Sequence, residues 1–232
     1  MYNRRAFPTK NLKIVQLSTD RVRRLTSSTL LFLTAGAMTL LGAGRLYAQQ
    51  GSAEAGQAKS AVCAACHGAD GNSAANAEWP SLAAQHAAYT VRQLEAYKDG
   101  QRPDPGMQGF AQSLTDEDMR DLAAFYATQP ITVKGTDPEL VERGQRIYRG
   151  GIAERGVAAC IACHGPSGKG NPLAGYPRVS HQHSPYLATT LRAYRSGSRR
   201  SDAPLNQMMR NVAELLLDDE IEALASYMQG LN

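Results

Sequence analysis

Residues 61–71 read AVCAACHGADG, and residues 158–168 read AACIACHGPSG. Each stretch holds two cysteines separated by two residues and followed directly by a histidine and a glycine. The same offset of 97 residues aligns positions outside these stretches, namely Pro80/Pro177, Gln85/Gln182, His86/His183, Tyr89/Tyr186, Tyr97/Tyr194 and Gly100/Gly197. Further along, the offset becomes 102 and pairs Met107 with Met209. We therefore predict two tandem copies of one domain.

The boundary between the copies is predicted within QPITVKGTDP, residues 129–138, which is rich in turn formers and lacks hydrophobic periodicity. The predicted organisation is a leader over residues 1–48, a first domain over 49–134 and a second domain over 135–232. Small domains with few aromatic residues (6% of the chain) bury little apolar surface. A large apolar cofactor would supply what these cores lack.

The predicted leader has the composition of a secretory signal peptide. It holds eight of the 25 basic residues but one of the 21 acidic ones, and residues 25–44 carry no charge. A basic segment, an apolar stretch and the small residue Ala48 before polar sequence indicate export with cleavage after Ala48. A retained membrane anchor is the alternative, because 20 uncharged residues can span a bilayer.

Removing the leader changes the net charge from +4 to −3, so the sequence gives no support for nucleic-acid binding. The two copies also differ in charge. Residues 51–134 sum to −4 and residues 135–232 to +1. Four arginines of the second copy lie near one another in the sequence: Arg192, Arg195, Arg199 and Arg200. We hypothesise that the two copies bind different partners and that these arginines form one of the docking faces.

Helical patterns dominate both copies. Apolar residues recur at helical spacing in the last segment of each copy: Met119, Leu122, Ala123 and Tyr126, then Ile221, Leu224, Ala225 and Met228. Thr115 is the predicted N-cap of the first of these helices, and middle helices are predicted over about 85–99 and 185–196. Asp137-Pro138 is predicted to open the first helix of the second copy. No segment alternates as a strand would, so the predicted fold class is all-α.

Three chemistries fit a Cys-x-x-Cys pair in an exported protein. A disulfide within each pair would close a very small loop and would leave the adjacent histidine unexplained. A zinc site with four cysteines would have to join the two copies. Cys-x-x-Cys-His is the attachment signature of c-type haem, in which the thiols add to the vinyl groups and the histidine binds the iron. We therefore predict two haem c groups, held by Cys63, Cys66 and His67 and by Cys160, Cys163 and His164.

The second axial ligand is predicted to be Met107 in the first copy and Met209 in the second. These methionines align, and both follow loop sequence in which a side chain can approach the iron. A thioether ligand suits a haem of high reduction potential. Met119 and Met228 lack a methionine in the other copy and are predicted to be core residues. Met208 also lacks a counterpart, since Gly106 occupies its place.

Histidine ligation is the alternative, because His86 and His183 also recur, each just before a middle helix. A histidine at the start of a helix is more commonly a surface or hydrogen-bonding residue. His181 has no histidine counterpart in the first copy and is predicted to be solvated.

The chain resembles the dihaem cytochrome c4 family, two class I cytochrome c domains in tandem. CAACHGADGNS, CIACHGPSGKGN, the paired methionines and the ending DDEIEALASYMQGLN carry this resemblance, which covers about residues 51–232. It implies two cytochrome c domains related by a pseudo-twofold axis, His/Met ligation of both irons, and a periplasmic location with loose membrane association. It also implies that the carbonyl groups of Pro80 and Pro177 accept a hydrogen bond from the haem-ligating histidines.

The resemblance implies an electron carrier of respiration and not an enzyme. The expected donors are a quinol-cytochrome c reductase or a small copper protein, and the expected acceptor is a haem-copper terminal oxidase. A dihaem peroxidase is one alternative, but it needs one iron with an open or displaceable sixth position, which matched methionines disfavour. A haem subunit of a dehydrogenase complex is the second alternative.

Overall fold

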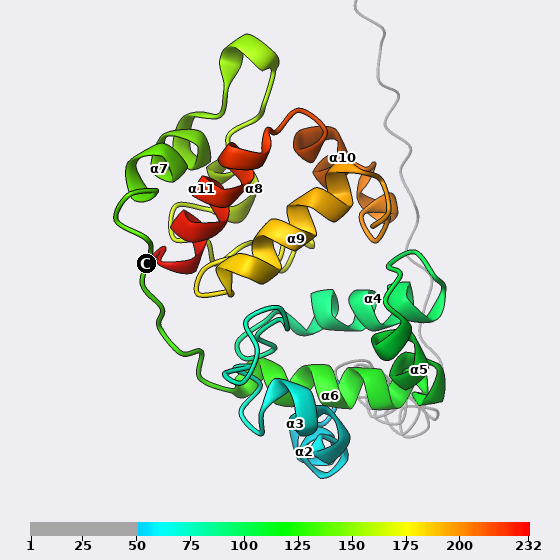
Figure 1. Ribbon diagram of the computed structural model, residues 1–232. Coiled ribbons are helices and arrows are strands. Elements are labelled where there is room, and N and C mark those ends of the chain that lie inside the picture. Colours follow the sequence, from blue (N-terminus) through cyan, green and yellow to red (C-terminus); the bar gives the residue numbers. More distant parts are fainter. Residues whose placement is uncertain (1–50) are drawn as a thin grey trace, which may run out of the picture. The chain divides into compact units, whose positions relative to one another are not determined.

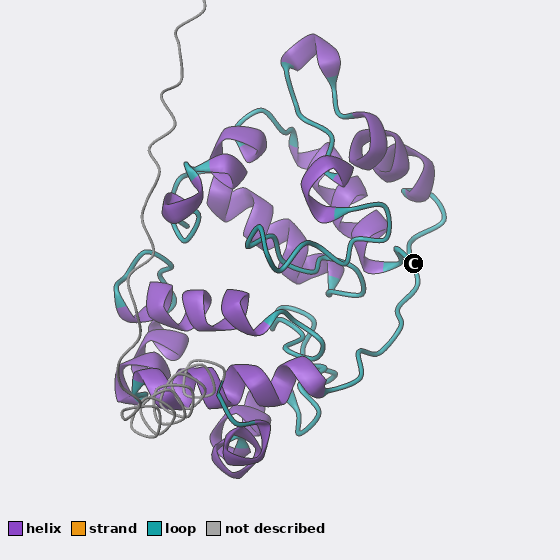
Figure 2. Ribbon diagram, turned by 180° about the vertical axis from the view of Figure 1, so that it is seen from behind, coloured by secondary structure: helices purple, strands orange, loops and turns teal. Residues whose placement is uncertain are grey.

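The computed structural model describes residues 51–232, which are drawn in colour in Figure 1. The predicted leader, residues 1–48, lies outside the described residues. Helices joined by loops make up the described part, and its β-structure is limited to two isolated bridges, Ile152–Val157 and Asn171–Tyr176 (Figure 2). The prediction of an all-α fold is confirmed for this part of the chain. None of its helices is long and apolar enough to cross a membrane.

Two sets of helices follow one another along the chain. The first set consists of α2 (Ala53–Lys59), α3 (Ala61–His67), α4 (Ala87–Lys98), α5 (Pro105–Ser113) and α6 (Asp116–Thr128). The second set consists of α7 (Val141–Gly150), α8 (Ile161–His164), α9 (Ser184–Arg195), α10 (Met208–Ala213) and α11 (Asp218–Gln229), with 3-10 turns η1 (Ala153–Arg155) and η2 (Ala203–Leu205). The turn η1 lies in the longer α7–α8 connection of the second copy, and η2 lies where the offset rises from 97 to 102.

Helix ends follow the sequence signals in most places. The Thr115 hydroxyl accepts a hydrogen bond from the backbone N–H of Asp118, and the Asp118 carboxylate accepts one from the backbone N–H of Thr115. This capping box satisfies two backbone N–H groups at the start of α6. Gly100 and Gly197 follow α4 and α9 with φ of 68° and 73°, the left-handed conformation that ends a helix. Asp137-Pro138 does not open the first helix of the second domain, because Leu140 is the N-cap of α7.

In each domain the first and last helices cross at a glycine. A Cβ atom added to Gly56 of α2 would lie 2.0 Å from the carbonyl oxygen of Asp121 in α6. A Cβ atom on Gly144 of α7 would lie 2.2 Å from the carbonyl oxygen of Ala223 in α11. Only glycine permits such an approach of two backbones, so both crossings depend on the missing side chain.

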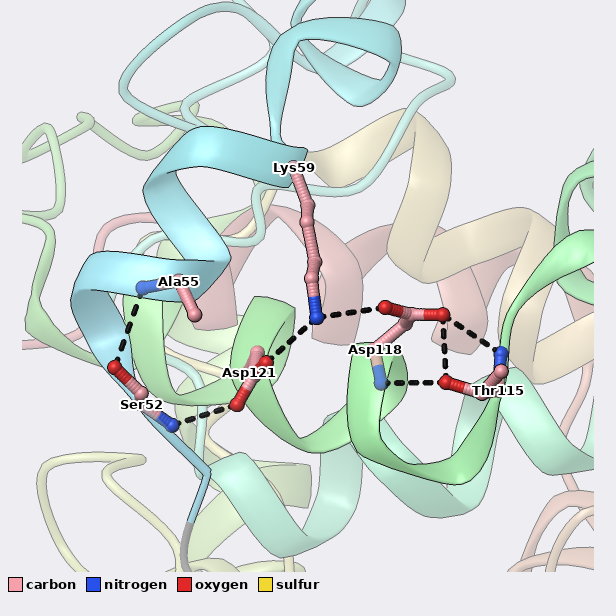
Figure 3. A network of polar contacts seen from close by, with 6 residues as sticks. All are labelled: Ser52, Ala55, Lys59, Thr115, Asp118 and Asp121. Carbon is pink, nitrogen blue, oxygen red and sulfur yellow. Dashed lines mark hydrogen bonds and ion pairs between the residues drawn. The ribbon is translucent and has the colours of Figure 1, made fainter.

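A polar network fixes the same α2–α6 pair in the first domain (Figure 3). The Lys59 ammonium lies 2.7 Å from a carboxylate oxygen of Asp118 and 2.7 Å from one of Asp121. Asp121 also accepts the backbone N–H of Ser52, which precedes α2, at 2.7 Å. In the second domain Glu220, the counterpart of Asp118, forms an ion pair with Arg155 of the turn η1 instead of with the first helix.

The apolar residues of the last helices face inward, as their spacing predicts. Met119, Leu122, Ala123 and Tyr126 are buried, and so are Ile221, Leu224, Ala225 and Met228. The buried apolar cluster of the first domain is nevertheless small and centres on Leu122, Phe125 and Tyr126. The second domain has a larger buried apolar cluster, which includes Ile147, Leu187 and Leu224.

Reciprocal side-chain contacts join the two domains. The Gln85 amide donates to the carbonyl of Arg178 at 3.0 Å and accepts the Arg178 N–H at 3.0 Å. The Gln182 amide does the same to Ser81, at 2.9 and 2.7 Å. Gln85 aligns with Gln182 and Ser81 aligns with Arg178 at the offset of 97. The two contacts are therefore equivalent, as in an interface with twofold symmetry.

Candidate haem sites

The Cys-x-x-Cys-His residues of the first domain lie on one short helix. Cys63, Cys66 and His67 belong to α3, which ends where Gly68 adopts a left-handed φ of 77°. Both thiols are half-buried and neither is in a disulfide, while the His67 ring is buried. The spacing of i and i+3 places both sulfur atoms on one side of the helix.

The second domain builds the same arrangement on a shorter helix. Cys160 is the N-cap of α8, Cys163 lies within it, and His164 is its last residue, before Gly165 with φ of 75°. These thiols are also free and half-buried, and the His164 ring is buried. The aligned motifs therefore give aligned sites.

Each histidine ring is oriented by a proline carbonyl. The Nδ1 atom of His67 lies 3.0 Å from the Pro80 oxygen, and the Nδ1 atom of His164 lies 3.0 Å from the Pro177 oxygen. A carbonyl oxygen can only accept, so Nδ1 carries the proton and Nε2 keeps its lone pair for a metal. Burial lowers the pKa of both histidines, which keeps the rings neutral.

The first thiol of each motif is held in its neutral form. Burial raises the pKa of Cys63 and raises that of Cys160 to about 11. A redox-active cysteine needs an accessible thiolate, which the raised pKa disfavours at these two positions. Within residues 51–232 no three histidine, cysteine or acidic side chains converge on a metal position. The disulfide and zinc alternatives therefore find no support in the described part of the chain.

A cavity of about 490 Å³ runs beside both motifs. Its lining includes all four cysteines, His67 and His164, together with apolar residues of both domains such as Leu82, Leu94, Leu122, Leu187, Leu191 and Leu224. An apolar cavity with two thiols and an imidazole nitrogen at its wall has the shape and the chemistry that a covalently attached haem requires.

Met107 and Met209 line this same cavity. They lie in the first turns of α5 and α10, so each occupies a short helix that follows a loop, where the sequence had indicated a loop position. Met208 also borders the cavity, and its sulfur lies 3.8 Å from the Tyr176 hydroxyl. Met119 and Met228 are buried core residues, as predicted.

The other histidines have structural roles. The Nε2 atom of His86 contacts the carbonyl oxygen of Lys169 at 2.8 Å, and that of His183 contacts the carbonyl oxygen of Asn72 at 2.9 Å. These contacts join the two domains and, like the glutamine contacts, are related by the offset of 97. His181 was expected to be solvated, but the prediction was wrong: its ring is buried and its Nδ1 lies 3.3 Å from the carbonyl oxygen of Gln229.

Two buried arginines form a feature that the sequence analysis missed. Arg102 donates to the Tyr186 hydroxyl at 2.8 Å, and Arg199 donates to the Tyr89 hydroxyl at 2.9 Å, so each reaches into the other domain. Both donate to the same amide oxygen, that of Gln93, at 3.2 and 2.6 Å. The signal for this cluster was the recurrence of Tyr89 and Tyr186, which the repeat had already aligned.

Among the described residues no carboxylate balances the charge of these two guanidinium groups. Neither forms an ion pair with a carboxylate of residues 51–232, although both are buried. Burial raises the pKa of Tyr186, but the two arginines outweigh it and bring that pKa to about 7. They line a second cavity, of about 360 Å³, beside His67 and Met107. Buried charges need partners, and the propionates of a bound haem would be anions of the kind that these arginines could pair with.

The predicted arginine docking face is only partly present. Arg192 and Arg195 form ion pairs with Asp218, and Arg192 also pairs with Glu222. Arg199 is 3% exposed and belongs to the cluster between the domains. Arg200 is exposed. The four residues therefore do not form one exposed basic surface, because the chain turns inward at Arg199 after α9.

Fold and site together define a c-type cytochrome with two haem-binding domains. The sequence matches the cytochrome c family over residues 53–129 and again over 141–232. It is 44% identical over 191 residues to cytochrome c4 of Azotobacter vinelandii, covering 78% of this chain and 90% of that protein. It is also 37% identical to a thiosulfate dehydrogenase electron acceptor of Stutzerimonas stutzeri, covering 81% and 85%.

The structure agrees with these sequence relationships. The crystal structure of reduced recombinant cytochrome c4 from Pseudomonas stutzeri superposes with a TM-score of 0.76 at 42% identity, covering 78% of this chain and 100% of that one. The chain belongs to the cytochrome c4 family. It is thus a dihaem c-type electron-transfer protein and not an enzyme, and its two Cys-x-x-Cys-His motifs fit two covalently bound haem c groups.

Proposed function

We propose that this chain is a periplasmic electron carrier in which His67 and Met107 hold one haem iron and His164 and Met209 hold the other. The observation that carries the proposal is the geometry at the two histidines. In each domain a proline carbonyl fixes Nδ1, which leaves Nε2 free beside a cavity that a matched methionine also lines.

The haem iron, when bound, supplies reversible one-electron transfer. The chain would supply a histidine and a methionine to each iron, so that the same two side chains hold it in both oxidation states and little rearrangement accompanies the change of charge. Histidine and methionine together favour a high potential. Two filled positions also leave no vacant site for peroxide, which argues against the peroxidase alternative.

We further propose that residues 1–48 are an export signal and that residues 49–134 and 135–232 are the two domains. Export suits covalent attachment, since a loosely held cofactor would be lost outside the cytoplasm. The leader composition supports this location, and a retained anchor would instead hold the carrier at the membrane surface.

The proposed route runs from a quinol-cytochrome c reductase or a small copper protein to a haem-copper terminal oxidase. The similarity to cytochrome c4 proteins supports a carrier role. A second route has its own support, because relatives are described as electron acceptors of thiosulfate dehydrogenase. In that route the donor would be a dehydrogenase that oxidises a sulfur compound. Reduction rates with purified donors of both kinds distinguish the two routes.

The ligand assignment is tested with Met107→His and Met209→His. Each substitution should remove one methionine–iron charge-transfer band and lower the potential of one haem by roughly a tenth of a volt or more, because imidazole stabilises the oxidised iron better than a thioether does. The measurement is a spectroelectrochemical titration of the two-haem protein.

Met208→Leu is the matched control for Met209→His. It changes the adjacent methionine, which also borders the cavity, and should retain both bands and both potentials. Loss of a band in Met208→Leu, or two intact bands in Met209→His, would contradict the assignment. A preparation with fewer than two haems would contradict the function itself.

A further inference from the structure

The surroundings of the two haem-motif histidines differ at one position. The Nδ1 atom of His67 lies 3.0 Å from the Pro80 oxygen and 3.1 Å from the Ser73 hydroxyl oxygen. The Nδ1 atom of His164 has the proline contact alone among the described residues. The counterpart of Ser73 at the offset of 97 is Gly170. One domain therefore has a hydroxyl where the other has a hydrogen atom.

Ser73 occupies a backbone conformation that favours glycine. Its φ is +50°, and that of Gly170 is +73°. Both residues donate their N–H to the carbonyl of the haem-motif histidine, at 2.8 Å to His67 and 2.9 Å to His164. The backbone is thus the same in both domains, and the serine side chain is retained in a left-handed, fully buried position where glycine would be less strained.

The second domain has no room for this hydroxyl. A Cβ atom on Gly170 would lie 2.4 Å from the carbonyl oxygens of both Tyr176 and Pro177. The difference between the domains is therefore built into the packing of the two loops, and a serine at position 170 would require the backbone to move.

The direction of the hydrogen bonds at Ser73 follows from its single proton. The Ser73 hydroxyl donates that proton to the Pro80 oxygen at 2.6 Å. The same oxygen atom can then only accept from the Nδ1–H of His67. The Nδ1–H of His67 is consequently shared between the Ser73 hydroxyl oxygen and the Pro80 carbonyl oxygen. The negative end of the hydroxyl dipole therefore faces the imidazole ring of His67.

We propose that Ser73 is a positioning residue that lowers the reduction potential of the first-domain haem relative to the same site without the hydroxyl. A second acceptor on Nδ1–H draws its proton further from the ring and gives the imidazole more negative character. A more electron-rich ligand stabilises the oxidised iron. This inference rests on the proposed ligation of iron by His67.

The test compares Ser73→Ala with Ser73→Gly in the haem-loaded protein. Both substitutions remove the hydroxyl, but alanine keeps the Cβ atom and the backbone strain, while glycine relieves the strain. Redox titration followed through the NMR signals of the separate haem methyl groups should show a shift of the first-domain potential to more positive values in both variants. The second-domain potential should stay in place.

A second readout reports on the hydrogen bond directly. The Nδ1–H proton resonance of His67 in the reduced protein should move upfield in both variants, because that proton loses one acceptor, while that of His164 should not move. Ser60→Ala is the matched control, since the buried Ser60 hydroxyl donates to the Gln57 carbonyl at 2.8 Å and takes no part at His67. It should leave both potentials unchanged.

An unchanged or more negative first-domain potential in both serine variants, with two haems and both methionine–iron bands present, would overturn the role of Ser73 and leave the proposed function standing. A wild-type protein in which His67 does not bind iron would overturn both. A shift in Ser73→Ala that is absent in Ser73→Gly would assign the effect to strain and would also overturn the proposal.

Discussion

Single residues determine the protonation state and the orientation of the imidazole rings at the two candidate haem sites. The carbonyls of Pro80 and Pro177 fix the tautomer of the haem-motif histidines, and burial keeps both rings neutral. Away from the sites, Lys59 has a comparable role for the fold, because two carboxylates converge on its ammonium group. Its hydrogen bond with Asp118 contributes most to raising the pKa of Lys59, and Lys59 lowers the pKa of Asp118 and Asp121.

We predict that Lys59→Met makes stability less dependent on pH. The depressed pKa values of Asp118 and Asp121 contribute stability above about pH 4, the value for an unfolded carboxylate, and this stability is lost as the pH falls through the lower folded values. The raised pKa of Lys59 contributes stability below about pH 10.4 that is lost at higher pH. The difference in unfolding free energy between wild type and Lys59→Met should therefore be largest near neutral pH and should shrink in acid.

Urea unfolding of the haem-loaded proteins at a series of pH values measures this difference. Lys98→Met is the control, because the Lys98 ammonium donates to the carbonyl of Leu114 and to no carboxylate among the described residues. Its effect should be independent of pH in the acid range. A Lys59→Met effect that is equally independent of pH would contradict the prediction.

At the scale of helices, both domains depend on the close crossing of their first and last helices. Gly56 meets the backbone of α6, and Gly144 meets the backbone of α11, at distances that leave no room for a methyl group. The apolar faces of α6 and α11 then complete the wall of the cavity, with Leu122 and Leu224 among the residues that line it. The crossing thus determines the depth of the space beside each motif.

We predict that Gly56→Ala destabilises the first domain by about 2 kcal/mol or more, because the new methyl group forces two packed helices apart. Thermal unfolding of the haem-loaded protein measures the loss. Gly109→Ala on α5 is the matched control, since nothing lies within 4 Å of a Cβ atom at that position. It should stabilise the protein by up to about 1 kcal/mol, as alanine favours a helix over glycine. Equal effects of the two substitutions would show that the crossing is not close-packed.

At the scale of the whole described chain, the two domains meet through contacts that occur in equivalent pairs. Gln85 and Gln182 each bind the backbone of the opposite domain, and Arg102 and Arg199 each reach a tyrosine of the opposite domain. The arginine cluster lies beside the cavities, so the same interface that joins the domains also borders the candidate haem sites.

We predict that each glutamine protects an amide of the other domain. Gln182→Ala should speed the hydrogen exchange of the Ser81 N–H, and Gln85→Ala should speed that of the Arg178 N–H, because each amide loses its side-chain acceptor. Gln182→Ala leaves the buried backbone N–H and carbonyl of Ser81 without their side-chain partner, which costs about 1–3 kcal/mol, whereas the part-buried groups of Arg178 lose less in Gln85→Ala. Site-resolved exchange measured by NMR reports both effects.

Gln112→Ala serves as the control for these exchange measurements. The Gln112 amide donates to the Lys98 carbonyl within the first domain and is exposed. Its removal should leave the Ser81 and Arg178 amides protected. If neither glutamine variant alters the predicted amide, the two domains do not hold each other through these contacts in solution.

The sequence by itself determined the duplication, the helical class and the thiol and imidazole residues of both sites. These follow from the short spacing of Cys-x-x-Cys-His, from hydrophobic periodicity and from an offset that holds across the repeat, all of which are local or additive properties of the chain. The aligned positions Gln85/Gln182 and Tyr89/Tyr186 were visible in the same way, although their partners were not.

Only the tertiary structure decided which polar residues are buried and what they contact. Arg199 and His181 were expected at the surface, but the chain folds them inward, where Arg199 contacts Tyr89 and His181 contacts Gln229. Ser73 reaches His67 only because a left-handed turn returns the chain to the ring. Burial depends on contacts between residues distant in sequence, and no local pattern encodes them.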